Sequence, residues 1–348
     1  MIARVPYTEK GFLDVGELIP HIQPFTWLWG GRGIGKTFGV LKYVRYNDPH
    51  KFLLLRRTQK QVDMLKKEIF NPFRPIDQFT GNLTAVKKDG DLALFYNGSL
   101  SDDGTVEAAG APVGYAAALS TIHNIRGIDM SDVDYVVFDE YIPEKHEKPI
   151  AHEYDAFLNA IETISRNREL QGRQPLKMIG LSNANTLGNP YFLGMGVIRQ
   201  VDRMLRRGTE IWQDPGRCLM LINITGSPVS DQKSSTSLYK LADSGSFRDM
   251  SLGNDFTEDH CSRQGSIPLR ECVPELAVGE LVIYRHKSAR IYYCCDHLSG
   301  SPKTYGSDDS SLKKFRVFES WIWSAYMQGL IVFQDILCEV LLKKYLNY

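Results

Sequence analysis

A glycine-rich stretch near the N-terminus has the residue types and spacing of a phosphate-binding site. Gly30, Gly35, Lys36 and Thr37 fit the pattern G-x-x-x-x-G-K-[ST]. Glycines let successive backbone N–H groups turn toward one anion, and the lysine can reach the β- and γ-phosphates of a nucleotide. The threonine hydroxyl is a ligand for Mg²⁺. The residues predicted to bind the nucleotide here are Gly30, Gly31, Arg32, Gly33, Ile34, Gly35, Lys36 and Thr37.

Two adjacent carboxylates form the second group with chemical potential. Asp139 and Glu140 end an apolar run at 135–138. We expect Asp139 to hold Mg²⁺ together with Thr37, and Glu140 to orient and polarise an attacking water. An apolar run that ends in Asp-Glu is a weak signal alone, but it gains weight from the phosphate pattern earlier in the chain. Together the two groups predict hydrolysis of a nucleoside triphosphate.

A parallel β-sheet would bring these groups to one edge. Continuous apolar runs are typical of buried parallel strands, and they occur at 25–29, 52–57, 116–122, 134–140, 177–185 and 218–224. Ligands bind at the carboxyl ends of such strands. Asn183 lies at one of these ends, where its side chain could touch the γ-phosphate or the attacking water. A turn-forming role for Asn183 is the alternative. The pattern predicts an α/β fold.

Other segments show different patterns. Two hairpin turns are predicted within 80–100, one at 88–91 and one at Asn97-Gly98. They indicate an antiparallel insertion. The stretch 227–258 is rich in polar and small residues and reads as a linker. Beyond it we expect a two-stranded ribbon at 280–295 and a long helix at 315–346. The predicted domains are therefore 1–226, a linker at 227–258, and 259–348.

Composition sets limits on partners and compartment. Lysines plus arginines number 41, as do aspartates plus glutamates, so a nucleic-acid partner would need locally concentrated basic groups. We expect no signal peptide, because residues 1–10 are charged, and no membrane span, because the apolar run 321–342 contains acidic residues. We expect buried reduced thiols, as in a cytosolic protein, at Cys218, Cys261, Cys272, Cys294, Cys295 and Cys338.

A family resemblance rests on three blocks of residues. The segment 119–127 carries Arg126-Gly127 and runs on to the Asp-Glu strand, Arg32 lies inside the phosphate loop, and 183–192 follows. These blocks resemble the large-terminase and phage DNA-packaging motors. The small size and short C-terminal domain are most similar to the encapsidation ATPases of salasvirus-type podophages. The resemblance covers about residues 20 to 200 and is thin after the linker.

This resemblance implies a fold and an active site shared between subunits. The fold would be a P-loop NTPase of the ASCE type with a mainly parallel sheet, using ATP and Mg²⁺. Arginines would act on the ATP of the neighbouring subunit, and Arg126 and either Arg166 or Arg168 match those places. The alternative is that these arginines pair with acidic neighbours on the surface.

The resemblance also implies partners. They are double-stranded DNA, the portal (connector) of a procapsid, and a homo-oligomeric ring, a pentamer by family resemblance, with a structural RNA left open. The protein would act in the host cytoplasm, attach transiently to the portal and be absent from the mature virion. The small α+β C-terminal domain would be a degenerate RNase H-like nuclease that contacts nucleic acid or the portal.

Three alternatives stay open from sequence. A terminase-type motor would keep an active nuclease, and Asp296 follows a predicted strand as a first metal-binding carboxylate would. Its candidate partners are Asp308, Asp309, Glu319 and Asp335. The second alternative is another P-loop DNA translocase or helicase. The third is a nucleotide-dependent switch or kinase.

Overall fold

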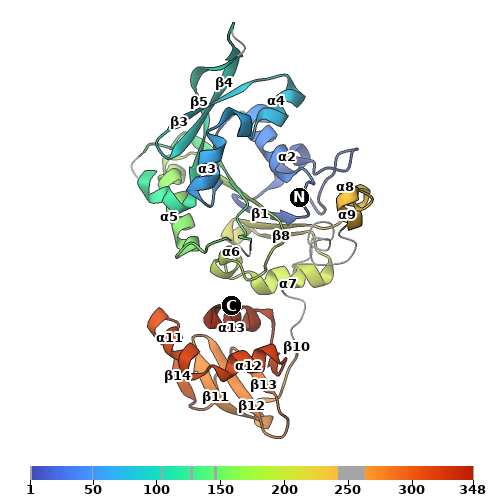
Figure 1. The fold of residues 1–348 in the computed structure, drawn as a ribbon, viewed down its shortest axis with the longest axis vertical. Helices are drawn as coiled ribbons and strands as arrows, with labels where there is room; N and C mark the ends of the chain where they lie inside the picture. Colours follow the sequence, from blue (N-terminus) through green and yellow to red (C-terminus); the bar gives the residue numbers. More distant parts are fainter. Residues whose placement is uncertain are drawn as a thin grey trace. The chain divides into compact units, whose positions relative to one another are not determined.

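The computed structural model describes residues 2–48, 50–102, 105–125, 128–144, 147–241 and 263–347 (Figure 1). The chain divides into two compact units. The first consists of Met1–Asn185 and Met204–Thr257, and the second of Thr186–Arg203 and Glu258–Tyr348. The second unit therefore includes a short piece of chain that precedes the last strands of the first. Both chemical groups found in the sequence belong to the first unit.

The first unit is built on one large sheet in the order β3-β4-β5-β2-β6-β7-β1-β9-β8. The run from β5 to β9 is parallel throughout, whereas β3, β4 and β8 pair antiparallel at the two edges. The strands are β1 (Phe25–Gly30), β2 (Lys51–Arg56), β3 (Thr84–Asp89), β4 (Leu92–Leu100), β5 (Val106–Ala118), β6 (Val133–Asp139), β7 (Lys177–Ser182), β8 (Ile211–Asp214) and β9 (Leu219–Ile224). The predicted mainly parallel α/β fold is confirmed.

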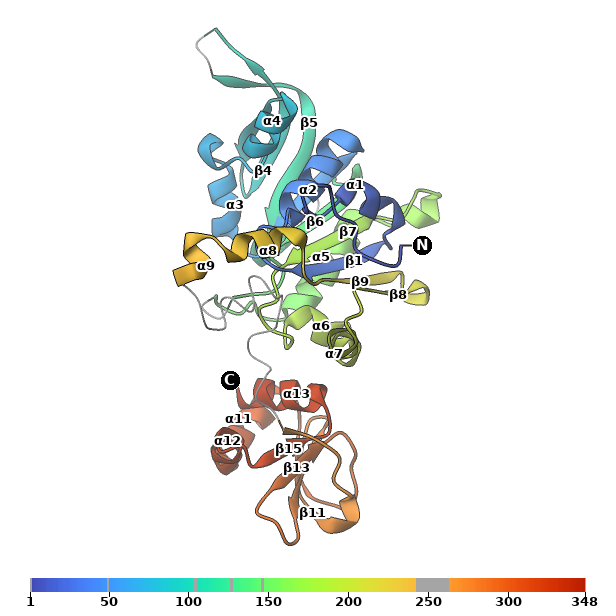
Figure 2. The same cartoon turned by 90° about the vertical axis from the view of Figure 1, so that its right-hand side faces the viewer.

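Helices cover both faces of this sheet, which explains why its central strands are apolar throughout. One face packs against α1 (Val15–Leu18), α2 (Lys36–Lys42), α3 (Gln59–Leu65) and α4 (Arg74–Thr80), with Leu28, Phe52 and Val137 in that core. The other face packs against α5 (Glu153–Ser165), where the Phe157 ring lies 5.3 Å from that of Trp27 and 5.8 Å from that of Phe138. Figure 2 shows the sheet between these layers.

The antiparallel insertion is confirmed, but only one of its two predicted turns exists. The turn at Gly90 joins β3 to β4, with Asp89 paired to Leu92. Asn97-Gly98 instead lies inside β4, where the pairing with β5 shifts register between Phe95 and Asn97. A Cβ at Gly98 would come within 2.7 Å of the Val106 side chain. Asn97-Gly98 therefore lies at a β-bulge, where the two strands approach each other closely. Glycine is favoured both there and in a hairpin turn, so the sequence pattern is the same for the two structures.

The second unit is a smaller α+β fold. Its sheet has the order β10-β15-β13-β12-β11-β14 in the described part of the chain. The strands are β10 (Arg263–Gln264), β11 (Cys272–Val278), β12 (Leu281–His286), β13 (Tyr292–Cys295), β14 (Lys303–Tyr305) and β15 (Ile331–Phe333). The predicted ribbon is confirmed as β12 and β13, which pair antiparallel. The α+β prediction for this region is also confirmed.

The long helix predicted at 315–346 is wrong. The chain there forms α11 (Asp309–Phe318), α12 (Trp321–Met327), strand β15 and α13 (Ile336–Leu346). Gly329 adopts a positive φ of 66°, which ends α12, and the chain then enters the sheet as β15, between β10 and β13. Asp335 then caps α13 by accepting a hydrogen bond from the Cys338 backbone N–H. The apolar residues of these four separate elements have a combined spacing that resembles one continuous helix.

The predicted linker contains helical structure. Its first part forms α8 (Pro228–Ser234) and α9 (Ser237–Leu241), and the remainder lies outside the described residues. Along the described ranges, none of the helices is long and apolar enough to cross a membrane.

The cysteine prediction is partly wrong. Cys272, Cys294, Cys295 and Cys338 are buried free thiols, whereas Cys218 is exposed. Cys218 has a positive φ of 51° in the turn that enters β9, where its side chain points away from the core. Cys261 lies outside the described residues.

Candidate active site

The phosphate loop follows β1 and leads directly into α2, as its sequence pattern predicts. Gly33 and Gly35 adopt φ values of 67° and 92°, a left-handed region that disfavours residues with a Cβ. Leu13 fastens the loop from outside, since its backbone N–H donates to the Ile34 carbonyl at 3.0 Å. Phe12, one of the aromatic residues near the N-terminus, lies against Gly35. The loop is therefore held in a curved conformation between β1 and α2.

The Lys36 side chain folds into the loop, where burial disfavours its positive charge. Its Nζ donates to the carbonyls of Gly30 and Gly31 at 2.8 and 2.7 Å, and it lies 3.3 Å from Asn183 Oδ1. Burial lowers the pKa of Lys36 to about 7; Asp139 opposes this effect, while other nearby cations add to it. An anion beside this ammonium would favour its charged form. The loop is thus suited to receive a phosphate chain.

Thr37 and Asp139 meet at the carboxyl edge of the sheet. The Thr37 hydroxyl donates to Asp139 Oδ1 at 3.0 Å, and the Asp139 side chain is buried. A hydroxyl oxygen next to a carboxylate is a donor set that suits Mg²⁺, which takes oxygen ligands and keeps several waters. These two residues therefore fit the metal that the sequence pattern implied.

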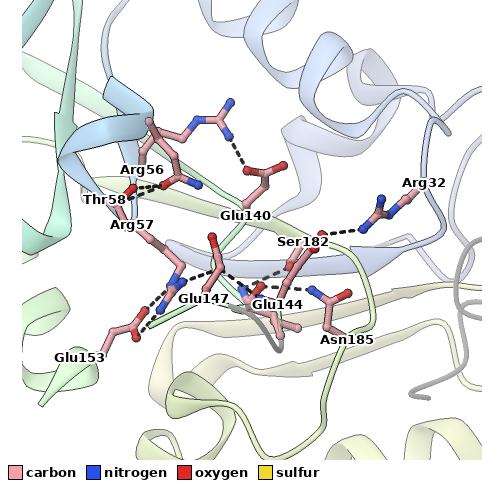
Figure 3. Close-up of polar contacts among 12 residues, drawn as sticks. Arg32, Arg56, Arg57, Thr58, Glu140, Glu144, Glu147, Glu153, Ser182 and Asn185 are labelled. Carbon is pink, nitrogen blue, oxygen red and sulfur yellow. Dashed lines mark hydrogen bonds and ion pairs between the residues drawn. The ribbon is translucent and has the colours of Figure 1, made fainter. Parts of the chain in front are cut away.

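Arg56, at the end of β2, bridges the two carboxylates that follow β6. Its guanidinium contacts Asp139 Oδ2 and Glu140 Oε2, each at 2.9 Å. Figure 3 shows Arg56 extended toward Glu140 from the neighbouring strand. Partial burial raises the pKa of Glu140, and the charge of Arg56 opposes that rise. Arg56 lies near the end of the apolar run 52–57, and the sequence pattern alone gives this arginine no role.

Replacing Arg56 by methionine should move the acidic limb of the pH–rate profile for ATP hydrolysis to higher pH by about one unit. An adjacent cation typically lowers a carboxylate pKa by about one to three units, and the variant removes that effect from Glu140. The measurement is kcat/KM across pH for wild type, Arg56→Met and the exposed control Arg74→Met. An acidic limb that stays in place in Arg56→Met would show that Arg56 does not control protonation of Glu140.

A chain of ion pairs links the phosphate loop to α5 through the loop after β6 (Figure 3). Arg32 Nη2 lies 2.5 Å from Glu144 Oε1. Glu147 accepts from the Glu144 backbone N–H at 3.1 Å and pairs with Arg57 at 2.6 Å. The fully buried Arg57 also binds Glu153, at the start of α5, through two hydrogen bonds of 2.7 and 2.9 Å. Arg32 is therefore directed away from the loop by an acidic partner that the sequence did not reveal.

Polar residues after β7 line the same site. Asn183 lies beside Lys36, as described above, and Asn185 donates to the Ile142 carbonyl at 3.3 Å. Glu140, Glu144 and Glu147 border a small cleft together with Ser182 and Asn183. The turn-forming role considered for this region falls to Asn189, which caps α6 (Pro190–Gly194). Asn183 thus stays a prediction for contact with phosphate or water.

The arginines expected to act on a neighbouring subunit differ in exposure. Arg168 is buried: its guanidinium donates to the Val133 carbonyl at 2.6 Å and pairs with Asp134. This burial argues against Arg168 as the arginine that acts on a neighbouring subunit, and the choice between Arg166 and Arg168 stays a prediction. Arg166 ends α5 and pairs with exposed Asp129 at 3.2 Å, a contact that is cheap to break. Arg126 lies outside the described residues.

Within the second unit, two of the candidate nuclease carboxylates share an arginine. Arg199, in α7 (Ile198–Arg207), contacts Asp296 at 2.6 Å and Asp335 at 2.7 Å. Asp308 caps α11, and Glu319 accepts from the Tyr305 hydroxyl. Asp309, in the first turn of α11, completes the candidate set. Among the described residues, no cluster of three or more potential metal ligands is found.

The sequence matches a known protein family over most of its length. The model of the podovirus DNA encapsidation protein (Gp16) family matches residues 12–264. This chain belongs to that family. The DNA packaging proteins of Bacillus phages PZA and phi29 are each 26% identical to it over 256 residues, which is 71% of this chain and 67% of each relative. The DNA packaging protein of Bacillus phage B103 is 29% identical over 237 residues, 66% of this chain and 63% of that protein.

Solved structures agree with this family assignment at the level of fold. The chain resembles a subunit of the bacteriophage Phi-29 viral genome packaging motor assembly with a TM-score of 0.65 and 18% identity. That match covers 97% of this chain and 98% of the other. The Phi-28 gp11 DNA packaging motor matches with a TM-score of 0.62 and 17% identity, covering 98% and 99%. The resemblance predicted from sequence is confirmed.

Proposed function

We propose that this member of the encapsidation family is an ATP-hydrolysing motor that drives double-stranded DNA into a procapsid. The observation that carries the proposal is the meeting of three elements at one sheet edge. There the phosphate loop presents Lys36, Thr37 lies against Asp139, and Glu140 comes directly after the strand that ends at Asp139. This arrangement has the parts needed for phosphoryl transfer to water.

In this proposal each group has a distinct task. The loop backbone and Lys36 bind the phosphate chain, and Asn183 contacts the outer phosphate or the attacking water. Thr37 and Asp139 would hold Mg²⁺, which supplies charge neutralisation on the phosphate oxygens when bound. Glu140 accepts the proton of the attacking water, and its raised pKa makes it a stronger base than a glutamate with the ordinary pKa.

Before hydrolysis, Arg56 must release Glu140. The guanidinium that bridges Asp139 and Glu140 would compete with the water and the metal for the same oxygens. Movement of Arg56 away from the carboxylates therefore offers a point at which hydrolysis can be controlled.

The proposed partners follow from the family. We propose a homo-oligomeric ring in which Arg166, and Arg126 where it reaches the edge, complete the neighbouring site. Contact with DNA would be mainly to phosphates, because a translocase must move along any sequence. The ring would attach to the procapsid portal in the host cytoplasm and leave it before the virion matures. A scaffold RNA remains an open partner.

The test is packaging itself. Wild-type protein, procapsids bearing portals, and DNA should give ATP-dependent protection of DNA from added nuclease, and Asp139→Asn should abolish it. Asp155→Asn, on the exposed side of α5, is the matched control and should package normally. ATP hydrolysis without protected DNA would point instead to another P-loop translocase or helicase.

The alternative of an active nuclease has less support. Arg199 occupies the oxygens of Asp296 and Asp335 that two metal ions would need. A guanidinium cannot activate water as a metal does. The pairing favours a motor whose second unit contacts nucleic acid or portal without cutting DNA.

A further inference from the structure

Lys233 reaches the phosphate loop from α8, 201 residues further along the chain than Arg32. Its Nζ donates to the Arg32 carbonyl at 2.6 Å. The same Nζ lies so close to Gly33 that a Cβ there would collide with it. The ammonium is therefore placed directly on the loop predicted to bind phosphates.

The position of α8 does not depend on this lysine. Ser227, which caps α8, donates from its hydroxyl to the Gly11 carbonyl at 2.8 Å, and this contact is buried. Gly11 has a φ of 81°, and a Cβ there would come within 2.7 Å of Pro228 Cβ. The start of α8 is thus packed against the N-terminal segment that also fastens the loop (Figure 2, gold helix). These contacts hold α8 in a position that places the Lys233 side chain at the loop.

The loop gathers more positive charge than its protein neighbours balance. The Lys36 ammonium donates to the Gly30 and Gly31 carbonyls inside the loop, and the Lys233 ammonium donates to the Arg32 carbonyl of the same loop. Arg32 is paired with Glu144, whereas Lys233 has no acidic partner within the part of the chain that the structure describes. Burial lowers the pKa of Lys233. A polyanion at the loop would favour the charged form of Lys233 and accept a charge-assisted hydrogen bond from it.

We propose that Lys233 is a further phosphate ligand of the nucleotide bound by its own subunit. It completes the phosphate site from outside the loop and connects nucleotide occupancy to α8 and α9. The Arg32 carbonyl accepts the hydrogen bond of the ammonium in this structure, and a phosphate oxygen of the bound nucleotide would take over that contact. The inference rests on the proposed function, because it requires that a nucleotide binds here.

Equilibrium titration of the full-length protein with a fluorescent ATP analogue tests the proposal. Lys233→Ala should weaken binding by about ten- to a hundredfold, the range for one hydrogen bond between charged groups. Lys233→Arg should recover part of the loss, because it keeps the charge. Lys240→Ala, an exposed lysine on α9, is the matched control and should bind like wild type.

A second measurement separates phosphate binding from mere fastening of α8. Melting temperatures are recorded without nucleotide and with saturating ATP. A phosphate ligand predicts a smaller ATP-induced stabilisation in Lys233→Ala than in wild type. A lower melting temperature without ATP, combined with wild-type ATP affinity, would overturn the proposal in favour of a structural contact.

The outcomes also distinguish this inference from the proposed function. Wild type that fails to bind the analogue would refute both. If wild type binds the analogue, Lys36→Met binds it on the order of a hundredfold more weakly, and Lys233→Ala binds it normally, only the role of Lys233 is refuted.

Discussion

Glu140→Gln is expected to slow ATP hydrolysis about a hundred- to ten-thousandfold while leaving ATP affinity close to wild type. The amide has nearly the same shape as the carboxylate but cannot accept the proton of the attacking water. ATP binding depends on the loop and Lys36, which this change does not touch. Steady-state turnover and titration with a fluorescent ATP analogue measure the two properties separately.

The Glu140→Gln result needs a control for the change of charge. Glu162→Gln removes one carboxylate from the exposed side of α5 and should retain wild-type turnover. In Glu140→Gln we also expect a weaker contact with Arg56, because a neutral amide attracts the guanidinium less than a carboxylate does. Turnover that survives in Glu140→Gln would remove Glu140 from the role of general base and leave Glu144 and Glu147, in the same cleft, as the acids to examine.

Lys36→Met should weaken ATP binding on the order of a hundredfold, because it removes the ammonium that reaches the phosphates. Without nucleotide the same change acts on stability with the opposite sign. Lys36 is a buried cation whose pKa is lowered from 10.5 to about 7, so folding works against its protonation. Methionine fills a similar volume and carries no charge.

The stability effect of Lys36 should depend on pH in a defined direction. Between pH 7 and 10.5 the unfolded chain holds the proton of Lys36 and the folded chain does not. The contribution of this group to the free energy of unfolding therefore rises with pH across that window and is least favourable below it. The advantage of Lys36→Met over wild type should shrink by up to a few kcal/mol between about pH 7 and pH 10.

Urea unfolding of the two proteins at several pH values measures this difference. Lys60→Met, which removes an exposed lysine from α3, should show no such dependence. A gap between wild type and Lys36→Met that stays constant with pH would mean that Lys36 keeps its charge in the folded protein.

Local sequence patterns were sufficient to predict the phosphate loop and the buried strands that end at the site. The spacing of Gly30, Gly35, Lys36 and Thr37 predicts a loop whose backbone must curve, and Gly33 and Gly35 have the required positive φ values. Apolar runs ending in Asp139 and Asn183 predicted buried strands that end at one edge, since both faces of a parallel sheet are covered. These features depend on neighbouring residues, so a single chain segment contains the whole signal.

The sequence-based predictions were wrong where one residue pattern is compatible with two different structures. Asn97-Gly98 predicts a turn, but the glycine is needed where β4 and β5 approach closely. The apolar spacing after 315 fits one helix, yet Gly329 and the cap at Asp335 divide it around a strand. Which alternative wins is decided by packing against distant strands, and local propensity does not contain that information.

Only the tertiary structure decided the partners of the charged groups. Arg56 meets Asp139 and Glu140 because β2 and β6 are neighbours in the sheet, and Arg32 meets Glu144 across the sheet edge. Arg168 is held away from the surface by Val133 and Asp134, which argues against a contact with another subunit. A charged side chain looks the same in sequence whether it is paired, buried or free, because its electrostatics depend on atoms brought near by folding. The sequence thus determined that the chain has a phosphate loop and two carboxylates, and the fold determined which cations hold them.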